Sequence, residues 1–285
     1  MSGIVVVGAG QAGSSCVAKL RSLGFEGRIT LIGSEPVPPY QRPPLSKKYL
    51  LGEMELERLF LRPESYYGEQ GIDLRLNQEV TAIEPGARQV IVGGAPLRYD
   101  ELVLTTGSVP RRLPDAVGGG LKGVYVVRDL RDVDAMAPEF QAGRHLLVIG
   151  GGYIGLEAAA VAAHRGLKVT LVEMADRILQ RVAAKETSDY FRALHARHGV
   201  DIREGVGLER LLGEAKVEAS WTEPPGAEDI QRRDDERAQP RQAGAHGRLR
   251  GVGHGSLQAV QVPAAQVAGH ADGAVRGGSA RPAVA

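Results

Sequence analysis

The sequence predicts an α/β protein with two Rossmann-like βαβ units, followed by a tail of different composition. Each unit shows an apolar strand, a glycine-rich loop, a helix and a second apolar strand, in this order. The two units are alike enough to form an internal repeat. A chain of 285 residues has room for about two domains. We expect domains at residues 1–112 and 113–216 and a low-complexity, disordered tail at 217–285.

The first βαβ unit begins close to the N-terminus. Residues 4–7 and 29–32 are apolar runs typical of strands, with a helix expected between them. Gly8, Gly10 and Gly13 form a GxGxxG pattern directly after the first run. The first glycine permits a tight turn, the second lets the backbone approach a pyrophosphate, and the third lets the helix pack closely on the strand. This context predicts a dinucleotide site.

The second βαβ unit repeats the pattern. Residues 145–149 and 168–172 predict strands, and Gly150, Gly152 and Gly155 form a second GxGxxG pattern between them. A single pattern of this kind is a weak signal, whereas two complete ones are hard to explain by chance. Two dinucleotides in one chain indicate a tightly held flavin and an exchangeable nicotinamide, since hydride transfer between them is the commonest reason to hold both.

An acidic residue closes the second strand of each unit. Glu35 is placed to hold ribose hydroxyls of the first dinucleotide, with Ser34 as a competing candidate. Glu173 is placed to accept a hydrogen bond from a ribose 2′-hydroxyl and to repel a 2′-phosphate, which favours NADH over NADPH. Arg177 lies four residues later and weakens this preference.

Composition and charge exclude several function classes. Lys and Arg total 35 against 34 for Asp and Glu, so the charge balance gives no reason to expect nucleic acid or a membrane surface as partner. No apolar run approaches the ~20 residues needed to span a bilayer. The single cysteine, Cys16, suits a reducing cytoplasm and excludes a redox dithiol. The histidines do not cluster with other ligands, so we expect them in solvated or capping roles and expect no metal.

The last part of the chain differs in kind from the rest. After Trp221 the sequence contains no Lys, Phe, Tyr, Met or Asn, and Ala, Gly, Arg, Gln and Pro dominate. Such a composition predicts no packed core from about residue 217 onward. A change of reading frame and an authentic flexible tail are both open explanations of the abrupt shift.

Three further stretches and one single residue carry a resemblance to a known family. Residues 40–47 read YQRPPLSK, residues 105–107 read TTG, Arg128 follows, and residues 150–157 read GGGYIGLE. Together, over about residues 3–216, they resemble the FAD-dependent NAD(P)H:ferredoxin reductases of the putidaredoxin, rhodocoxin and rubredoxin reductase type. The resemblance implies FAD in the first unit and NAD in the second. It also implies a 2Fe-2S ferredoxin-type protein or rubredoxin as electron acceptor.

The resemblance also assigns roles to single residues. It implies that Ala12, Lys47, Val80 and Arg128 contact FAD and that Lys47 lies beside the isoalloxazine, where its charge stabilises the reduced ring. Glu157 is expected to pair with Lys47, and these two form the expected catalytic pair. The residues expected to bind a cofactor are Gly8, Gly10, Ala12, Gly13, Ser34, Glu35, Arg42, Lys47, Val80, Thr106, Gly107, Arg128, Gly150, Gly152, Tyr153, Ile154, Gly155, Glu157 and Glu173.

The chain also departs from the family it resembles. The family has a second FAD motif with a Gly-Asp pair and then a C-terminal domain that helps to dock the ferredoxin, and nothing after Lys216 resembles either. We therefore expect weak FAD binding. Two alternatives to the reductase stay open: a non-catalytic flavoprotein that binds FAD and NAD, and a truncated, inactive reductase.

Overall fold

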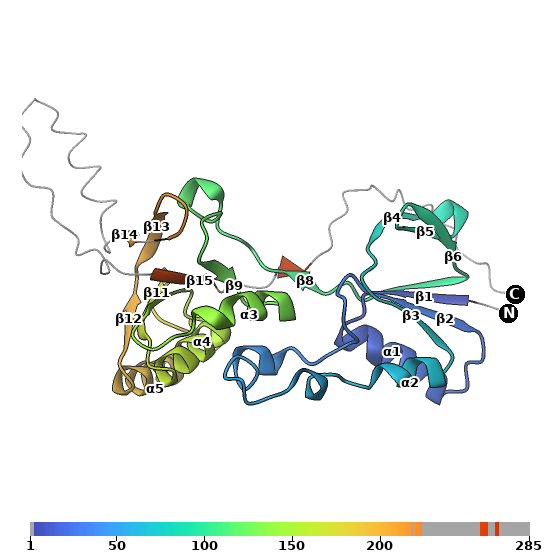
Figure 1. Ribbon diagram of the computed structural model, residues 1–285, viewed down its shortest axis with the longest axis horizontal. Helices are drawn as coiled ribbons and strands as arrows, with labels where there is room; N and C mark the ends of the chain where they lie inside the picture. Colours follow the sequence, from blue (N-terminus) through green and yellow to red (C-terminus); the bar gives the residue numbers. More distant parts are fainter. Residues whose placement is uncertain (1–2, 218, 224–256, 262–265, 268–285) are drawn as a thin grey trace, which may run out of the picture.

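The computed structural model describes residues 3–217, 219–223, 257–261 and 266–267. Within these residues the chain forms two parallel sheets, each with helices packed on it (Figure 1). The predicted α/β fold with two Rossmann-like units is confirmed.

The first sheet has four parallel strands in the order β3-β2-β1-β7. Its strands are β1 (Gly3–Val7), β2 (Arg28–Ile32), β3 (Ile72–Arg75) and β7 (Glu101–Leu104). Helices α1 (Gln11–Ser22) and α2 (Glu64–Glu69) pack on one side of it (Figure 1). An antiparallel sheet of β4 (Val80–Glu84), β5 (Gln89–Val92) and β6 (Ala95–Arg98) supplies buried valines to the other side.

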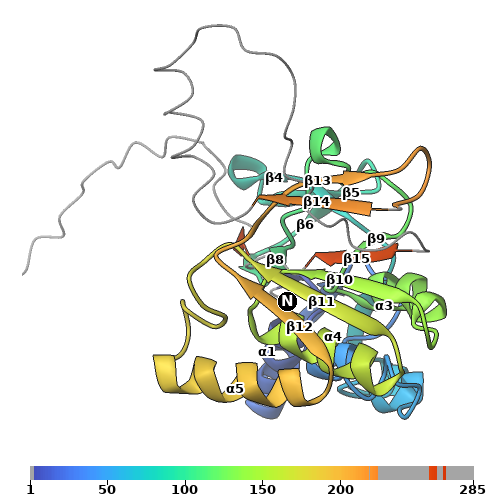
Figure 2. The same ribbon diagram turned by 90° about the vertical axis from the view of Figure 1, so that its left-hand side faces the viewer.

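The second sheet has five parallel strands in the order β12-β11-β10-β15-β9. Its strands are β9 (Val124–Val126), β10 (His145–Ile149), β11 (Lys168–Glu173), β12 (Val200–Glu204) and β15 (Leu257–Gln261). Its helices are α3 (Leu130–Met136), α4 (Tyr153–His164) and α5 (Lys185–Arg197). Leu146 and Leu171 face these helices, whereas Leu147 and Val172 face the side of β13 (Gly207–Leu212). Figure 2 shows α4 and α5 on one face of this sheet, with β13 and its antiparallel partner β14 (Ala219–Glu223) toward the other.

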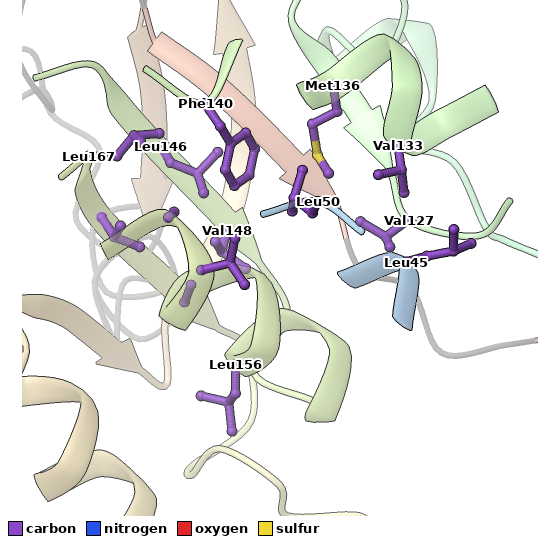
Figure 3. Packing of buried hydrophobic residues seen from close by; sticks show 14 of the residues in the cluster. Leu45, Leu50, Val127, Val133, Met136, Phe140, Leu146, Val148, Leu156 and Leu167 are labelled. Atoms are coloured by element: carbon purple, nitrogen blue, oxygen red, sulfur yellow. The ribbon is translucent and has the colours of Figure 1, made fainter. Parts of the chain in front are cut away.

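The proline-rich loop of the first unit packs into the second unit. It contains the short 3-10 helices η1 (Pro43–Ser46) and η2 (Leu56–Arg58). Leu45 and Leu50 are buried in the same apolar cluster as Val133 and Met136 of α3 (Figure 3). Arg165, just after α4, donates a hydrogen bond of 2.8 Å to the backbone carbonyl of residue 51. The proline-rich loop, which includes YQRPPLSK, is therefore held against the second unit.

Three strands lie in the part of the chain for which the composition predicted no regular structure. They are β14 (Ala219–Glu223), β15 and β16 (Gln266–Val267). β15 pairs in parallel with β10 and β9, and β16 pairs with β8 (Ser108–Val109). A strand between two others is held by backbone hydrogen bonds on both edges, and these do not depend on aromatic or large apolar content. The rest of the expected tail lies outside the described residues.

Candidate functional site

The first glycine loop has the geometry that its three glycines predict. Gly8 has a φ of +111°, and a Cβ there would lie 2.1 Å from the carbonyl oxygen of Thr105. A Cβ on Gly13 would lie 2.0 Å from the Gly8 oxygen, so α1 packs directly on the loop. A Cβ on Gly10 would meet nothing within 4 Å. This open face is where a ligand can approach the backbone.

The second glycine loop repeats this arrangement. Gly150 has a φ of +110°, and a Cβ on Gly155 would lie 2.1 Å from the Gly150 oxygen. Gly152 again faces open space. The next two residues, Tyr153 and Ile154, are 51% and 40% exposed although they are large and apolar.

Both loops lead into helices whose N-termini lack a protein cap. Gly10 and Gly152 are the N-cap residues of α1 and α4, no side chain caps either helix, and neither first turn contains an acidic residue. By contrast, α3 has a capping box in which Asp129 and Asp132 each bond to a backbone N–H of the other's residue. The first-turn N–H groups of α1 and α4 can therefore bind an anion such as a pyrophosphate.

A pocket of about 260 Å³ opens beside the first glycine loop. It brings together eight of the expected cofactor-binding residues: Gly8, Gly10, Ser34, Glu35, Arg42, Thr106, Gly107 and Arg128. Ala12, Gly13, Lys47 and Val80 do not line it. Gly13 is instead buried against the loop, and Ala12 is exposed on the first turn of α1.

A polar network holds the wall of this pocket. The Glu35 carboxylate accepts a hydrogen bond of 2.5 Å from the Tyr40 hydroxyl and forms an ion pair of 2.5 Å with Arg42. Arg42 also donates to the Tyr40 hydroxyl at 3.2 Å and to the backbone oxygen of Arg128 at 2.8 Å. The Tyr40 hydroxyl accepts a further bond of 3.0 Å from the backbone N–H of Leu130. The network thus joins β2, the proline loop and the start of α3.

Burial changes the proton affinities of two members of this wall. The pKa of Tyr40 is raised because the phenol is buried and because it donates to Glu35. The pKa of Arg128 is lowered by burial and by the neighbouring charge of Arg42. At neutral pH the Tyr40 phenol remains a hydrogen-bond donor and the Arg128 guanidinium remains charged, so Arg128 contributes positive charge to the pocket.

Lys47 and Glu157 form the expected ion pair, at 2.7 Å. The same Glu157 oxygen accepts a hydrogen bond of 2.6 Å from the buried hydroxyl of Ser46. Lys47 also donates to the backbone oxygen of Pro43 at 3.1 Å. One of its three N–H donors is left without a partner among the described residues. The pair joins the proline loop to α4, the helix of the second glycine loop.

Glu173 is fixed over the second glycine loop. Its carboxylate accepts hydrogen bonds from the backbone N–H groups of Gly151, at 2.6 Å, and Ala175, at 2.8 Å. These two bonds hold the acidic side chain beside the loop and leave it further acceptor capacity.

Sequence reasoning missed several residues of the site. Tyr40, Asp129 and Arg131 line the pocket, but they are not among the residues that the sequence predicts to bind a cofactor. The signal for Tyr40 was its place two residues before Arg42 in the loop. The expectation of solvated or capping histidines is wrong for His195, which is 7% exposed. Its ring nitrogens lie 2.9 and 3.1 Å from the carbonyl oxygens of Phe191 and Leu156.

Among the residues that the structure describes, no group of three or more His, Cys, Asp or Glu side chains is placed to hold a metal ion. No helix in the same part of the chain is long and apolar enough to cross a membrane.

The loops and the pocket define a dinucleotide-binding oxidoreductase fold, and comparison with known proteins agrees. A family model described as pyridine nucleotide-disulphide oxidoreductase matches residues 2–229. The chain belongs to this family. Its single cysteine, Cys16, is half-buried on α1 and has no second cysteine with which to form a disulfide.

Several similar proteins are ferredoxin reductases by name. Putidaredoxin reductase CamA of Pseudomonas putida is 43% identical over 222 residues, which are 76% of this chain and 53% of that protein. The 5,5′-dehydrodivanillate O-demethylase ferredoxin reductase subunit of Sphingobium sp. is 43% identical over 217 residues, 76% of this chain and 52% of that protein. The resemblance noted in the sequence is confirmed.

A solved structure shows the same similarity. The crystal structure of the covalent putidaredoxin reductase–putidaredoxin complex matches with a TM-score of 0.75 and 41% identity, over 78% of this chain and 55% of that one. The chain thus spans about half the length of the relatives it matches.

Proposed function

We propose that this chain is the nucleotide-binding part of a flavoprotein oxidoreductase that passes electrons from NADH through FAD to a 2Fe-2S ferredoxin or a rubredoxin. The observation that carries the proposal is the pair of helix N-termini without a side-chain cap. The N-cap residue of each helix is a glycine at which a Cβ would meet nothing within 4 Å. We place FAD at the first loop and NADH at the second, within domains at 1–112 and 113–216. The single cysteine favours a cytoplasmic location.

The residues at the first loop fit FAD. The N–H groups of α1 bind the pyrophosphate, and the open face of Gly10 allows close approach. Arg42 and Arg128 supply positive charge on the pocket wall, and Glu35 has acceptor capacity left for a ribose hydroxyl. Ser34, Thr106 and Gly107 complete the wall. Ala12, Gly13 and Val80 keep their expected roles near FAD as part of this proposal.

The residues at the second loop fit a nicotinamide dinucleotide. Gly150, Gly152 and Gly155 shape the loop, and the exposed side chains of Tyr153 and Ile154 offer an apolar surface beside it. Glu173 accepts from the ribose 2′-hydroxyl and repels a 2′-phosphate, which selects NADH.

Lys47 and Glu157 link the two sites. A flavin held there would supply hydride uptake and one-electron release. The Lys47 ammonium keeps one donor free and stabilises negative charge beside it, while Glu157 and the carbonyl of Pro43 hold it in place. Ser46 in turn holds Glu157.

The test supplies the full chain with FAD, NADH and, in separate experiments, a purified 2Fe-2S ferredoxin or a purified rubredoxin under anaerobic conditions. Loss of the visible absorbance of either acceptor on addition of NADH supports the proposal. Reduction of the flavin without reduction of ferredoxin or rubredoxin contradicts it and favours the non-catalytic flavoprotein.

A further inference from the structure

Arg177 lies beside the proposed nicotinamide site but is bonded away from it. Its Nη1 donates to the hydroxyl oxygen of Ser188 at 2.6 Å, and its Nη2 donates to the backbone oxygen of Gln180 at 3.4 Å. Neither partner is charged, and the ion pairs found among the described residues do not include Arg177. It is a half-buried cation held only by neutral acceptors.

Ser188 is built to hold this guanidinium. It lies in the first turn of α5 and is completely buried. Its hydroxyl donates its one proton to the backbone oxygen of Ile178 at 2.6 Å. The oxygen is therefore oriented to accept from Arg177.

The segment that carries Arg177 crosses the second glycine loop. The backbone N–H of Leu179 donates to the Gly151 oxygen at 2.9 Å, and Ile178 would lie 2.6 Å from a Cβ on Gly151. Glu173, four residues before Arg177, accepts a hydrogen bond from the backbone N–H of the same glycine. Arg177 is thus next in sequence to Ile178, which lies against the loop, and four residues from the carboxylate that bonds to it.

We propose that Ser188 is a positioning residue for nucleotide selectivity: it holds Arg177 away from the 2′ position of the adenosine ribose. This inference rests on the proposed function. A guanidinium at that position binds a 2′-phosphate. Selection against NADP(H) then has two parts, repulsion by Glu173 and retention of Arg177 by Ser188.

The test measures dissociation constants of NAD⁺ and NADP⁺ by titration calorimetry on the full chain, so it needs no flavin and no turnover. Ser188→Ala should tighten NADP⁺ binding on the order of tenfold, the effect of one charge-assisted hydrogen bond to a phosphate, with NAD⁺ binding unchanged. Arg177→Ala should change neither constant, and the double variant should behave like the wild type. Thr187→Ala, on the neighbouring position of α5, is the matched control and should have no effect.

Two results would overturn the inference. One is an unchanged NADP⁺ constant in a Ser188→Ala protein that is folded by circular dichroism. The other is weaker NADP⁺ binding in Arg177→Ala, because it would show that the guanidinium already contacts the phosphate. If Ser188→Ala does not fold, the NADP⁺ dissociation constant of Arg177→Ala alone tests the inference. A wild-type protein that binds no NAD⁺ would overturn the proposed function as well. If the wild type binds NAD⁺, a negative result with the variants overturns only the inference about Ser188.

Discussion

The hydroxyl of Tyr40 joins three partners in the wall of the first pocket, and Tyr40→Phe removes it while keeping the ring. Tyr40 is 4% exposed and belongs to the apolar cluster shared by both units. Its hydroxyl donates to Glu35 and accepts from Arg42 and from the backbone of Leu130. The substitution therefore breaks three hydrogen bonds without creating a cavity larger than one oxygen atom.

The expected cost follows from what each partner loses. The backbone N–H of Leu130 belongs to a buried residue and is left without its acceptor, which costs about 1–3 kcal/mol. Glu35 keeps its ion pair with Arg42, and its side chain is 21% exposed, so water replaces the lost donor at little cost. We expect the free energy of unfolding to fall by about 2 kcal/mol.

Urea unfolding at pH 7 measures this loss. Tyr190→Phe is the matched control, because Tyr190 is 59% exposed, and it should change the free energy of unfolding by less than about 0.5 kcal/mol. A Tyr40→Phe protein as stable as the control would refute the reasoning.

The same residue predicts a pH dependence. Burial raises the pKa of Tyr40 in the folded protein, whereas the unfolded phenol titrates near its ordinary pKa of about 10. The stabilisation is therefore fully present below about pH 10 and is lost as the pH rises toward the folded pKa. Tyr49, whose pKa is raised to about 12 by burial and by its hydrogen bond to Asp134, adds to this decline. Tyr40→Phe should lose stability less steeply than the wild type above pH 10.

Three further predictions concern the proposed reaction. Lys47→Ala should slow flavin reduction more than it weakens NADH binding, and stopped-flow reduction measures both effects. A change in the NADH dissociation constant alone would contradict the role proposed for the charge of Lys47. Glu173→Gln should narrow the gap between NADH and NADPH, and equal rates with both nucleotides in the wild type would refute this selectivity. The chain should lose FAD on gel filtration, because residues 217–285 carry no second Gly-Asp motif to add a charge-assisted hydrogen bond worth about 1.5–3 kcal/mol. Elution with about one FAD per chain would contradict that expectation.

The parts of the fold that depend on local sequence could be predicted. Gly8 and Gly150 could be placed in tight turns because each follows an apolar strand and precedes a helix. The helix predicted after the second glycine loop is α4, which spans Tyr153–His164. At these positions the turn requires a positive φ and the residue is a glycine, so the sequence of a single βαβ unit is enough to predict the structure.

The parts that depend on contacts between distant segments could not be predicted. β15 joins β10 from more than a hundred residues away, and it lies in a part of the sequence whose composition gave no signal for a strand. The bond between Tyr40 and Leu130 spans 90 residues and exists only once the proline loop packs on α3. The bond between Arg177 and Ser188 spans 11 residues but depends on the turn before α5.

The central claim is that the two glycine loops hold FAD and NADH so that one reduces the other. The most direct test adds NADH to the full chain in the presence of excess FAD, without oxygen, and follows the visible absorbance of the flavin. We predict bleaching by NADH, and none in Gly155→Ala, because a Cβ at Gly155 would lie 2.1 Å from the Gly150 oxygen. A bound flavin that keeps its full absorbance in the wild type after NADH is added would contradict the account.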